Sequence, residues 1–170
     1  ASTTGGNILR KLNPEHVAAA IAYSAQVPFL KLAAVCLTGL EDGGISRMEL
    51  TLDERHMNPE GGPHGGVYAT LVDSATWWAV YAALQEDVGH TTLDLHVDDL
   101  GRALGGTLFV EGRCVKLGRT ICQAEAFIRD ESGKLVVHGT SKLMVVPGIP
   151  TISQAAEKTG PGPMPPKYLD

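Results

Sequence analysis

Residues 64 to 86 most constrain the fold, because apolar side chains occupy nearly every face of a helix of that length. A helix that is apolar all round must be buried all round. One carboxylate, Asp73, interrupts this apolar run, and an acid in such a setting is costly unless it has a partner or a role. A loop rich in Gly and Pro, residues 56 to 63, precedes the helix. The chain therefore has to wrap other elements around this helix.

The flanking sequence supplies those elements. Asn13-Pro14-Glu15 predicts a helix start, with a capping residue followed by Pro. This helix would run to about Gln26, and Pro28 breaks it. Apolar or alternating patterns typical of strands occupy residues 33–40, 47–52, 90–98, 107–117, 120–129 and 135–146. An antiparallel sheet wrapped around one helix accounts for this order, which places the chain in the α+β class. We expect a flexible end at 1–13, one domain at 14–146 and a loose Pro/Gly-rich tail at 147–170.

Composition narrows the function classes. The net charge of −5 over 170 residues argues against a nucleic-acid-binding protein, which needs a basic face. Cys36, Cys114 and Cys122 lie in apolar segments without metal-ligand spacing, which favours buried, reduced thiols in a cytoplasmic protein. No apolar run predicts a membrane span, and no signal peptide is visible. We expect neither a metal nor another cofactor.

The strand at residues 90 to 98 alternates strictly. Thr91, Leu93, Leu95 and Val97 fall on one face, and the opposite, polar face carries His90, Thr92, Asp94, His96 and Asp98.

The start of the central helix predicts an anion site. The first N–H groups of a helix have no partner within the helix, and the helix dipole favours negative charge there. Gly65 and Gly66 would let a substrate carbonyl approach these groups, so that they stabilise an oxyanion. The structural alternative is that the two glycines only allow the loop to turn tightly.

Asp73 is the predicted general base or nucleophile, and its alternative role is that of a buried acid paired with a core group. Asp73 lies eight residues after Gly65, which is about 12 Å along a helix. One chain therefore cannot place both groups on one carbonyl. An antiparallel partner helix could, so the spacing predicts a homodimer or homotetramer with shared sites.

Asn58, His64-Gly65-Gly66 and Thr70-Leu71-Val72-Asp73 together resemble the signature of hotdog-fold acyl-CoA thioesterases. The resemblance is strongest to the PaaI-like branch (phenylacetic acid degradation, thioesterase superfamily member 2 type) and spans residues 13 to 146. It implies a hotdog fold, an acyl-CoA substrate, and hydrolysis to free acid and CoA at a site shared between subunits.

The resemblance also implies roles for further residues. Asn58 would hold the water or the carbonyl, and Thr92 would orient the water or the acid. Independently of the resemblance, His64 is expected to shape the loop, and Trp77 would either wall the acyl pocket or pack in the core. Lys116, Arg119 and Arg102 are candidate contacts for the CoA phosphates, with solvated surface charges as the alternative. The segment Asp98–Arg102 departs from the family pattern, and so does Trp77, where a small residue is usual.

Three alternatives stay open at this stage. The chain could bind acyl-CoA without cleaving it, since a fold does not fix a function. It could be a hotdog enoyl-CoA hydratase or dehydratase, although His64 is badly placed for the proton transfers of that reaction. A metal on His56, His64 and Asp73 matches no familiar zinc spacing. The acyl group, aromatic or short- or medium-chain, is not specified by the sequence, nor is the role of the tail.

Overall fold

The computed structural model describes residues 10–85, 87–159 and 162–169. Most of the predicted flexible end, the predicted helix end at Glu86 and parts of the tail lie outside the described residues. Helices and strands follow in the order α1 (Pro14–Ser24), α2 (Pro28–Leu32), β1 (Cys36–Glu41), β2 (Ile45–Thr51), α3 (Gly65–Ala83), β3 (His90–Asp99), β4 (Thr107–Lys116), β5 (Ile121–Arg129), β6 (Leu135–Val145) and α4 (Ile152–Thr159).

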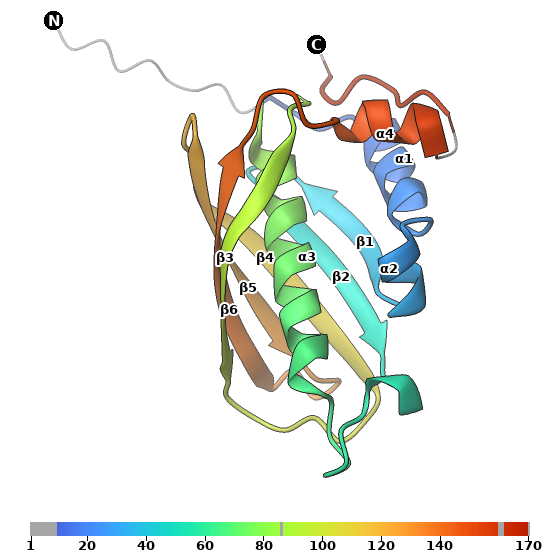
Figure 1. Ribbon diagram of the computed structural model, residues 1–170, viewed down its shortest axis with the longest axis vertical. Coiled ribbons are helices and arrows are strands. Elements are labelled where there is room, and N and C mark those ends of the chain that lie inside the picture. Colours follow the sequence, from blue (N-terminus) through green and yellow to red (C-terminus); the bar gives the residue numbers. More distant parts are fainter. Residues whose placement is uncertain (1–9, 86, 160–161, 170) are drawn as a thin grey trace, which may run out of the picture.

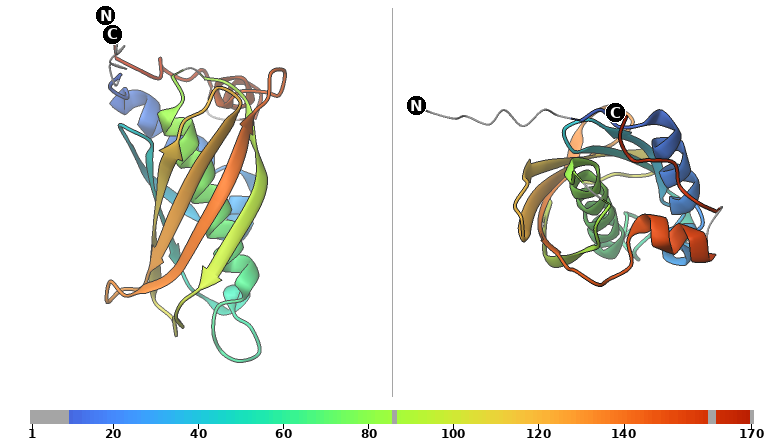
Figure 2. Two further views of the ribbon diagram at one scale, coloured as in Figure 1. Left: turned by 90° about the vertical axis from the view of Figure 1, so that its left-hand side faces the viewer. Right: turned by 90° about the horizontal axis from the view of Figure 1, so that it is seen from above.

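One antiparallel sheet curls around α3 (Figures 1 and 2). The strand order is β1-β2-β4-β5-β6-β3, so the last strand of the sheet in space is β3, which pairs with β6 only. The α1–α2 segment lies beside β1 at the other edge. The predicted α+β hotdog fold, an antiparallel sheet wrapped around a long central helix, is confirmed.

Two glycines on the sheet let α3 rest close to it. A Cβ at Gly112 would come 2.3 Å from the carbonyl oxygen of Ala75, and one at Gly139 would come 2.5 Å from Val72 Cγ1. Ser46 on β2 donates a hydrogen bond of 2.7 Å to the same Ala75 oxygen. Because helix and sheet meet so closely, the position of each α3 side chain relative to the strands is well determined.

The N-terminal elements differ from the prediction in one respect. The helix predicted from Pro14 is present, and Asn13 caps it by accepting from the N–H of Glu15. The strand predicted from Ala33 begins only at Cys36, because Pro28–Leu32 forms the short helix α2 with Pro28 in its first turn. Five residues are too few to show a helical period in the sequence.

Strand β3 contains a bulge that the alternation pattern concealed. Its pairing with β6 shifts between Thr92 and Asp94, so the two faces exchange at that point. His90 and Thr92 contact α3 before the bulge, and Val97 packs against the core after it. The predicted division into one apolar and one polar face is therefore wrong for the second half of the strand.

The C-terminal tail is more ordered than predicted. It contains α4, and Lys167 and Tyr168 are buried against the end of α3. Lys167 Nζ donates to the carbonyls of Tyr81 and Leu84, which are among the last of the helix. Burial lowers the pKa of Lys167 to about 7. The expectation of a loose arm is wrong for these residues.

The cysteines also correct an expectation. Only Cys122 is buried, whereas Cys36 is exposed and Cys114 is intermediate, and all three are free thiols. Among the residues that the structure describes, no helix is long and apolar enough to cross a membrane.

Candidate active site

The loop before α3 is held by Asn58. Its side-chain oxygen accepts from the N–H of Gly62 at 3.0 Å, and its backbone N–H donates to the Gly62 carbonyl at 2.7 Å. Its amide nitrogen donates to the carbonyl of Pro63 at 3.4 Å. The structure thus gives Asn58 a loop-closing position, and its predicted contact with water or substrate stays a prediction.

His64 caps α3 and determines which backbone donors stay open. Its Nδ1 accepts from the N–H of Gly66 at 2.9 Å, and its carbonyl accepts from the N–H of Val67 at 2.8 Å. Within the described part of the chain, the N–H of Gly65 has no partner, and a Cβ at Gly65 would meet nothing within 4 Å. Gly65 therefore presents an open donor at the start of the helix, while that of Gly66 is occupied.

Asp73 is half-buried and is oriented from β3. The hydroxyl of Thr92 donates to Asp73 Oδ1 at 2.8 Å. No donor among the described residues reaches Oδ2. The predicted proximity of Thr92 to the acid is thus present in the structure, and one carboxylate oxygen is left for another partner.

Gly65, Ala69 and Asp73 recur at intervals of four residues and so share one stripe of α3. Their separation along the helix axis puts Gly65 about 12 Å from Asp73. All three residues are exposed or half-buried, whereas the opposite side of the helix is buried in the sheet. Within one chain, the open N–H and the carboxylate therefore do not meet.

Trp77 continues this stripe one turn beyond Asp73. Its ring stacks on His90 with centroids 4.1 Å apart, and its Nε1 donates to the His90 carbonyl at 3.3 Å. Burial lowers the pKa of His90 below its usual 6.5, against the raising effect of hydrogen bonds to the Trp77 and Val88 carbonyls. His90, favoured in its neutral form, thus packs against Trp77 and holds the indole ring in place.

Two cavities open along α3 on the side of α1 and α2. The first, here the Gly66 cavity, measures about 420 Å³ and lies between the first turns of α3 and α2. Phe29 and Leu32 of α2 line it and are 58% and 71% exposed, which is unusual for such large apolar side chains. The second, here the Asp73 cavity, measures about 240 Å³ and contains the carboxylate and Trp77.

The predicted phosphate contacts are spread over the molecule. Lys116 and Arg119 are exposed at the β4–β5 turn. A Cβ at Gly44 would contact both Ala83, the last residue of α3, and Cys114, which lies two residues before Lys116. The β4–β5 turn is therefore near the C-terminal end of α3. That end is about 27 Å from Gly65 along the helix. Arg102 instead donates to the Glu60 carbonyl beside the glycine-rich loop. Of the three cations, only Arg102 lies near Gly65 within one chain.

His56 has both ring nitrogens engaged with the backbone. Nδ1 accepts from the N–H of Asp53 at 3.0 Å, and Nε2 lies 2.9 Å from the carbonyl oxygen of Ala33. Its side chain is buried and anchors the loop to the end of α2. This residue therefore supports the loop that positions Gly65.

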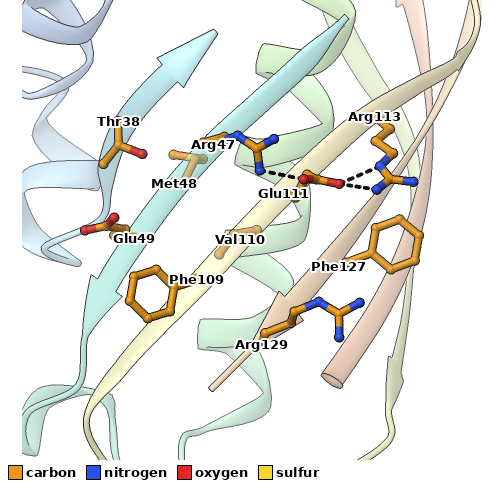
Figure 3. Close-up of a pocket in the computed structure, with 10 residues that line it drawn as sticks. All are labelled: Thr38, Arg47, Met48, Glu49, Phe109, Val110, Glu111, Arg113, Phe127 and Arg129. Carbon is orange, nitrogen blue, oxygen red and sulfur yellow. Dashed lines mark hydrogen bonds and ion pairs between the residues drawn. The ribbon is translucent and has the colours of Figure 1, made fainter. Parts of the chain in front are cut away.

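A third hollow, of about 340 Å³, lies on the outer face of the sheet (Figure 3). Three of its charged groups pair with one another, since Glu111 accepts from both Arg47 and Arg113, and Arg47 also binds Glu41. Burial tends to raise the pKa of Glu111, but hydrogen bonds from the two arginines outweigh it and lower that pKa. No carboxylate in this network faces an open backbone donor as Asp73 could face Gly65.

Sequence reasoning missed the walls of the Asp73 cavity. Tyr23, Val27 and Leu30 of the α1–α2 segment and Ile152 of α4 line it. These residues are far apart in the chain, and only tertiary packing brings them to Asp73.

Comparison with known proteins gives a family. A model of the thioesterase superfamily matches residues 61–137. A Pseudomonas aeruginosa protein named "Putative esterase" is 33% identical over 99 residues, which cover 58% of this chain and 72% of that protein. The mouse protein named acyl-coenzyme A thioesterase 13 is 29% identical over 93 residues, or 54% of this chain and 66% of that protein. Across the curated relatives, the match spans only 63% to 72% of their length.

Solved structures share the fold. Zebrafish thioesterase superfamily member 2 aligns with a TM-score of 0.66 at 23% identity, covering 74% of this chain and 93% of that one. The matched residues 61–137 include Gly65, Asp73 and Thr92, whereas α1, α2 and α4 lie outside them.

Proposed function

The chain belongs to the thioesterase superfamily, and we propose that it hydrolyses acyl-CoA thioesters to a free acid and CoA. One observation carries this proposal. The open N–H of Gly65 and the Asp73 carboxylate, with Oδ2 unpaired, share one accessible stripe of α3. The name of the mouse relative, acyl-coenzyme A thioesterase 13, supports acyl-CoA as the thioester.

The reaction needs an oxyanion donor and a base, and the two groups are suited to these roles. The Gly65 N–H would bind the carbonyl oxygen as it gains negative charge. Asp73 would remove a proton from water as the water attacks the carbonyl carbon. Alternatively, Asp73 would attack that carbon itself to form a mixed anhydride, which water then hydrolyses to the free acid and the regenerated carboxylate. The C–S bond then breaks, and the departing CoA thiolate takes up a proton. Thr92 holds the carboxylate in one orientation during these steps.

The separation of about 12 Å between the two groups requires a second chain. If two α3 helices pack antiparallel and cross at Ala69, Gly65 of each lies opposite Asp73 of the partner subunit. Glycine and alanine at the crossing allow the two backbones to approach closely, as the interdigitation of four-residue ridges requires. We therefore propose a homodimer, alone or within a tetramer, with two shared sites.

Exposed apolar surface supports the same dimer. Strand β3 is an edge of the sheet and is free to pair on its outer side. Leu93 and Leu95 on this strand are 49% and 38% exposed. An edge strand with such side chains is a favourable partner for its own copy. Pairing of β3 with β3 would bring the two α3 helices together.

Mixing two inactive variants tests the shared site. Gly65→Pro removes the open N–H, while Asp73→Asn removes the base. In a mixed dimer one site would carry both defects, and the other would be intact. Release of CoA thiol from acyl-CoA, followed with a thiol-trapping dye, should therefore reappear when the two variants are co-expressed. Activity that stays absent, in mixtures shown by mass to contain both chains in one dimer, would contradict a shared site.

The same assay separates the alternatives. A protein that binds acyl-CoA tightly and releases no thiol from any acyl-CoA tested is a binding protein, and hydrolysis is then wrong. Addition of water to an enoyl-CoA with the thioester left intact would identify a hydratase.

A further inference from the structure

The Asp73 cavity has one polar end and otherwise apolar walls. Asp73 and Ser74 are its polar residues. The apolar walls come from four helices and consist of Tyr23, Val27, Leu30, Trp77, Trp78 and Ile152. A cavity of this kind favours a ligand that is apolar except at the atom next to the carboxylate.

The α3 wall is rigid. Trp77 is fixed by stacking on His90 and by its hydrogen bond to the His90 carbonyl. Trp78 is 4% exposed and packs edge-on against both Trp77 and Tyr81. Because neither ring can turn without breaking these contacts, the cavity does not enlarge on this side.

The opposite wall includes α4, which is anchored at both sides of Ile152. The N–H of Ser153 donates to Asp87 Oδ2 at 3.1 Å, and Ala156 is fully buried. Upstream, Ile149 lies so close to Gly89 that a Cβ there would come 2.3 Å from Ile149 Cγ1. Figures 1 and 2 show α4 lying beside α1. The helix is therefore held where Ile152 closes the cavity.

The family model matches one part of the cavity lining and not the other. Asp73, Trp77 and Trp78 lie within the residues matched by the family model, 61–137. The wall residues Tyr23, Val27, Leu30 and Ile152 lie outside them. The chemistry would thus sit in the shared region, and the shape of the pocket would be set by segments outside it.

We propose that the Asp73 cavity is the acyl pocket, and that Tyr23 and Ile152 limit the acyl group to compact apolar acids. This inference rests on the proposed thioester hydrolysis. The volume of about 240 Å³ is smaller than that of pockets for drug-sized ligands, which suits an aryl or medium-chain acyl group and excludes a long straight chain. The aromatic walls favour flat rings in addition.

Substitution of the wall tests the inference through a ratio. The measured quantity is kcat/KM for dodecanoyl-CoA divided by kcat/KM for hexanoyl-CoA, which cancels any general loss of active protein. Ile152→Ala and Tyr23→Ala should each raise this ratio about tenfold or more, because they open room for several methylene groups. Ile152→Trp should lower it. Glu157→Ala, at an exposed position of the same helix, is the matched control and should leave the ratio unchanged.

The outcomes distinguish this inference from the proposed function. If the wild-type protein releases no thiol from any acyl-CoA, hydrolysis itself fails. If it hydrolyses acyl-CoA while Ile152→Ala, Tyr23→Ala and Ile152→Trp all keep the wild-type ratio, the acyl group lies elsewhere and only the pocket assignment is overturned. A wild-type preference for dodecanoyl-CoA over hexanoyl-CoA would overturn it as well.

Discussion

The hollow around Asp73 and the hollow on the outer sheet face combine the same kinds of residue in opposite ways. Both contain carboxylates next to aromatic rings, and their volumes are about 240 and 340 Å³. On the outer face, Glu111 is bound by two arginines (Figure 3). At α3, Asp73 receives a single hydrogen bond from Thr92, and the Gly65 donor on the same stripe is open.

The two hollows thus differ in how far their carboxylates are satisfied by hydrogen bonds, and not in which kinds of residue they contain. The Glu111 carboxylate is bound by Arg47 and Arg113, and exposed ion pairs of this kind contribute little to stability. Asp73 keeps an oxygen free next to apolar walls, where a charge interacts more strongly than in water.

The largest effect should come from the carboxylates themselves. Asp73→Asn keeps the size and the hydrogen-bond acceptor for Thr92 but removes the base, so turnover should fall by roughly 10²- to 10⁴-fold. Glu111→Gln is the matched change in the outer hollow and should leave turnover unchanged. Steady-state thiol release from hexanoyl-CoA measures both. Equal losses of turnover in the two variants would show that Asp73 is no more important for the reaction than Glu111.

The next effect concerns the open donor at Gly65. Gly65 is the first residue of α3, where Pro is tolerated, and His64 already has the extended backbone, ψ 140°, that a following Pro requires. Gly65→Pro should therefore preserve the helix and lower kcat by roughly 10²- to 10³-fold through loss of one oxyanion donor.

Gly65→Ala is its control, because it retains the N–H and its Cβ meets open space. It should keep most of the activity. Circular dichroism verifies the helix in both variants. A Pro variant that retains the turnover of an active Ala variant would show that the N–H has no catalytic part.

A smaller effect is expected at Thr92. Thr92→Val removes the hydroxyl that holds Asp73 while keeping the shape of the side chain, so turnover should fall roughly ten- to a hundredfold, the value of one hydrogen bond to a charged group. Thr92→Ser restores the hydroxyl and should recover most of the loss. If Ser and Val behave alike in the thiol-release assay, Thr92 acts through packing alone.

The long elements were predictable from sequence because their patterns extend over many residues. The apolar run of α3 and the alternation of the strands predicted the α+β class, whereas the strand order did not follow from these patterns and the hotdog fold was implied by the family resemblance. The spacing of Gly65 from Asp73 predicts a site shared between subunits, and this stays a prediction. The bulge in β3 was not predictable, because it depends on pairing with β6. Without the bulge, Thr92 and Val97 could not both face inward, because residues five apart in a regular strand point to opposite faces.

Helix α4 carries a signal that was overlooked. Thr151 and Gln154 form reciprocal hydrogen bonds, in which each side chain accepts from the backbone N–H of the other. This is a capping box, readable as Thr-x-x-Gln in the sequence. The surrounding Pro and Gly residues obscured it. The walls that α4 and α1 give to the Asp73 cavity could not be read, because no local pattern records a contact between residues 23 and 152.

The smallest effect is on the stability of the fold in mild acid. It distinguishes buried histidines behind α3 from the Glu111 carboxylate on the outer face of the sheet. Burial is the main cause that lowers the pKa values of His16 and His90 below their usual 6.5. The unfolded chain then binds protons below pH 6.5 that the folded chain does not, so stability is fully present above that pH and is lost as the pH falls through it.

The outer carboxylate Glu111 contributes in a lower window, because its pKa is lowered from 4.5 and its contribution disappears only as the pH falls below that value. The urea midpoint should therefore drop between about pH 7.5 and about pH 5.5, and Glu111→Gln should not alter that drop. The double variant His16→Gln, His90→Gln should reduce it, even though loss of the Tyr81 and Trp77 contacts lowers its stability at both pH values. If Glu111→Gln reduces the drop and the histidine variant does not, an acid-sensitive group lies on the outer face, and His16 and His90 are not the groups that titrate in this window.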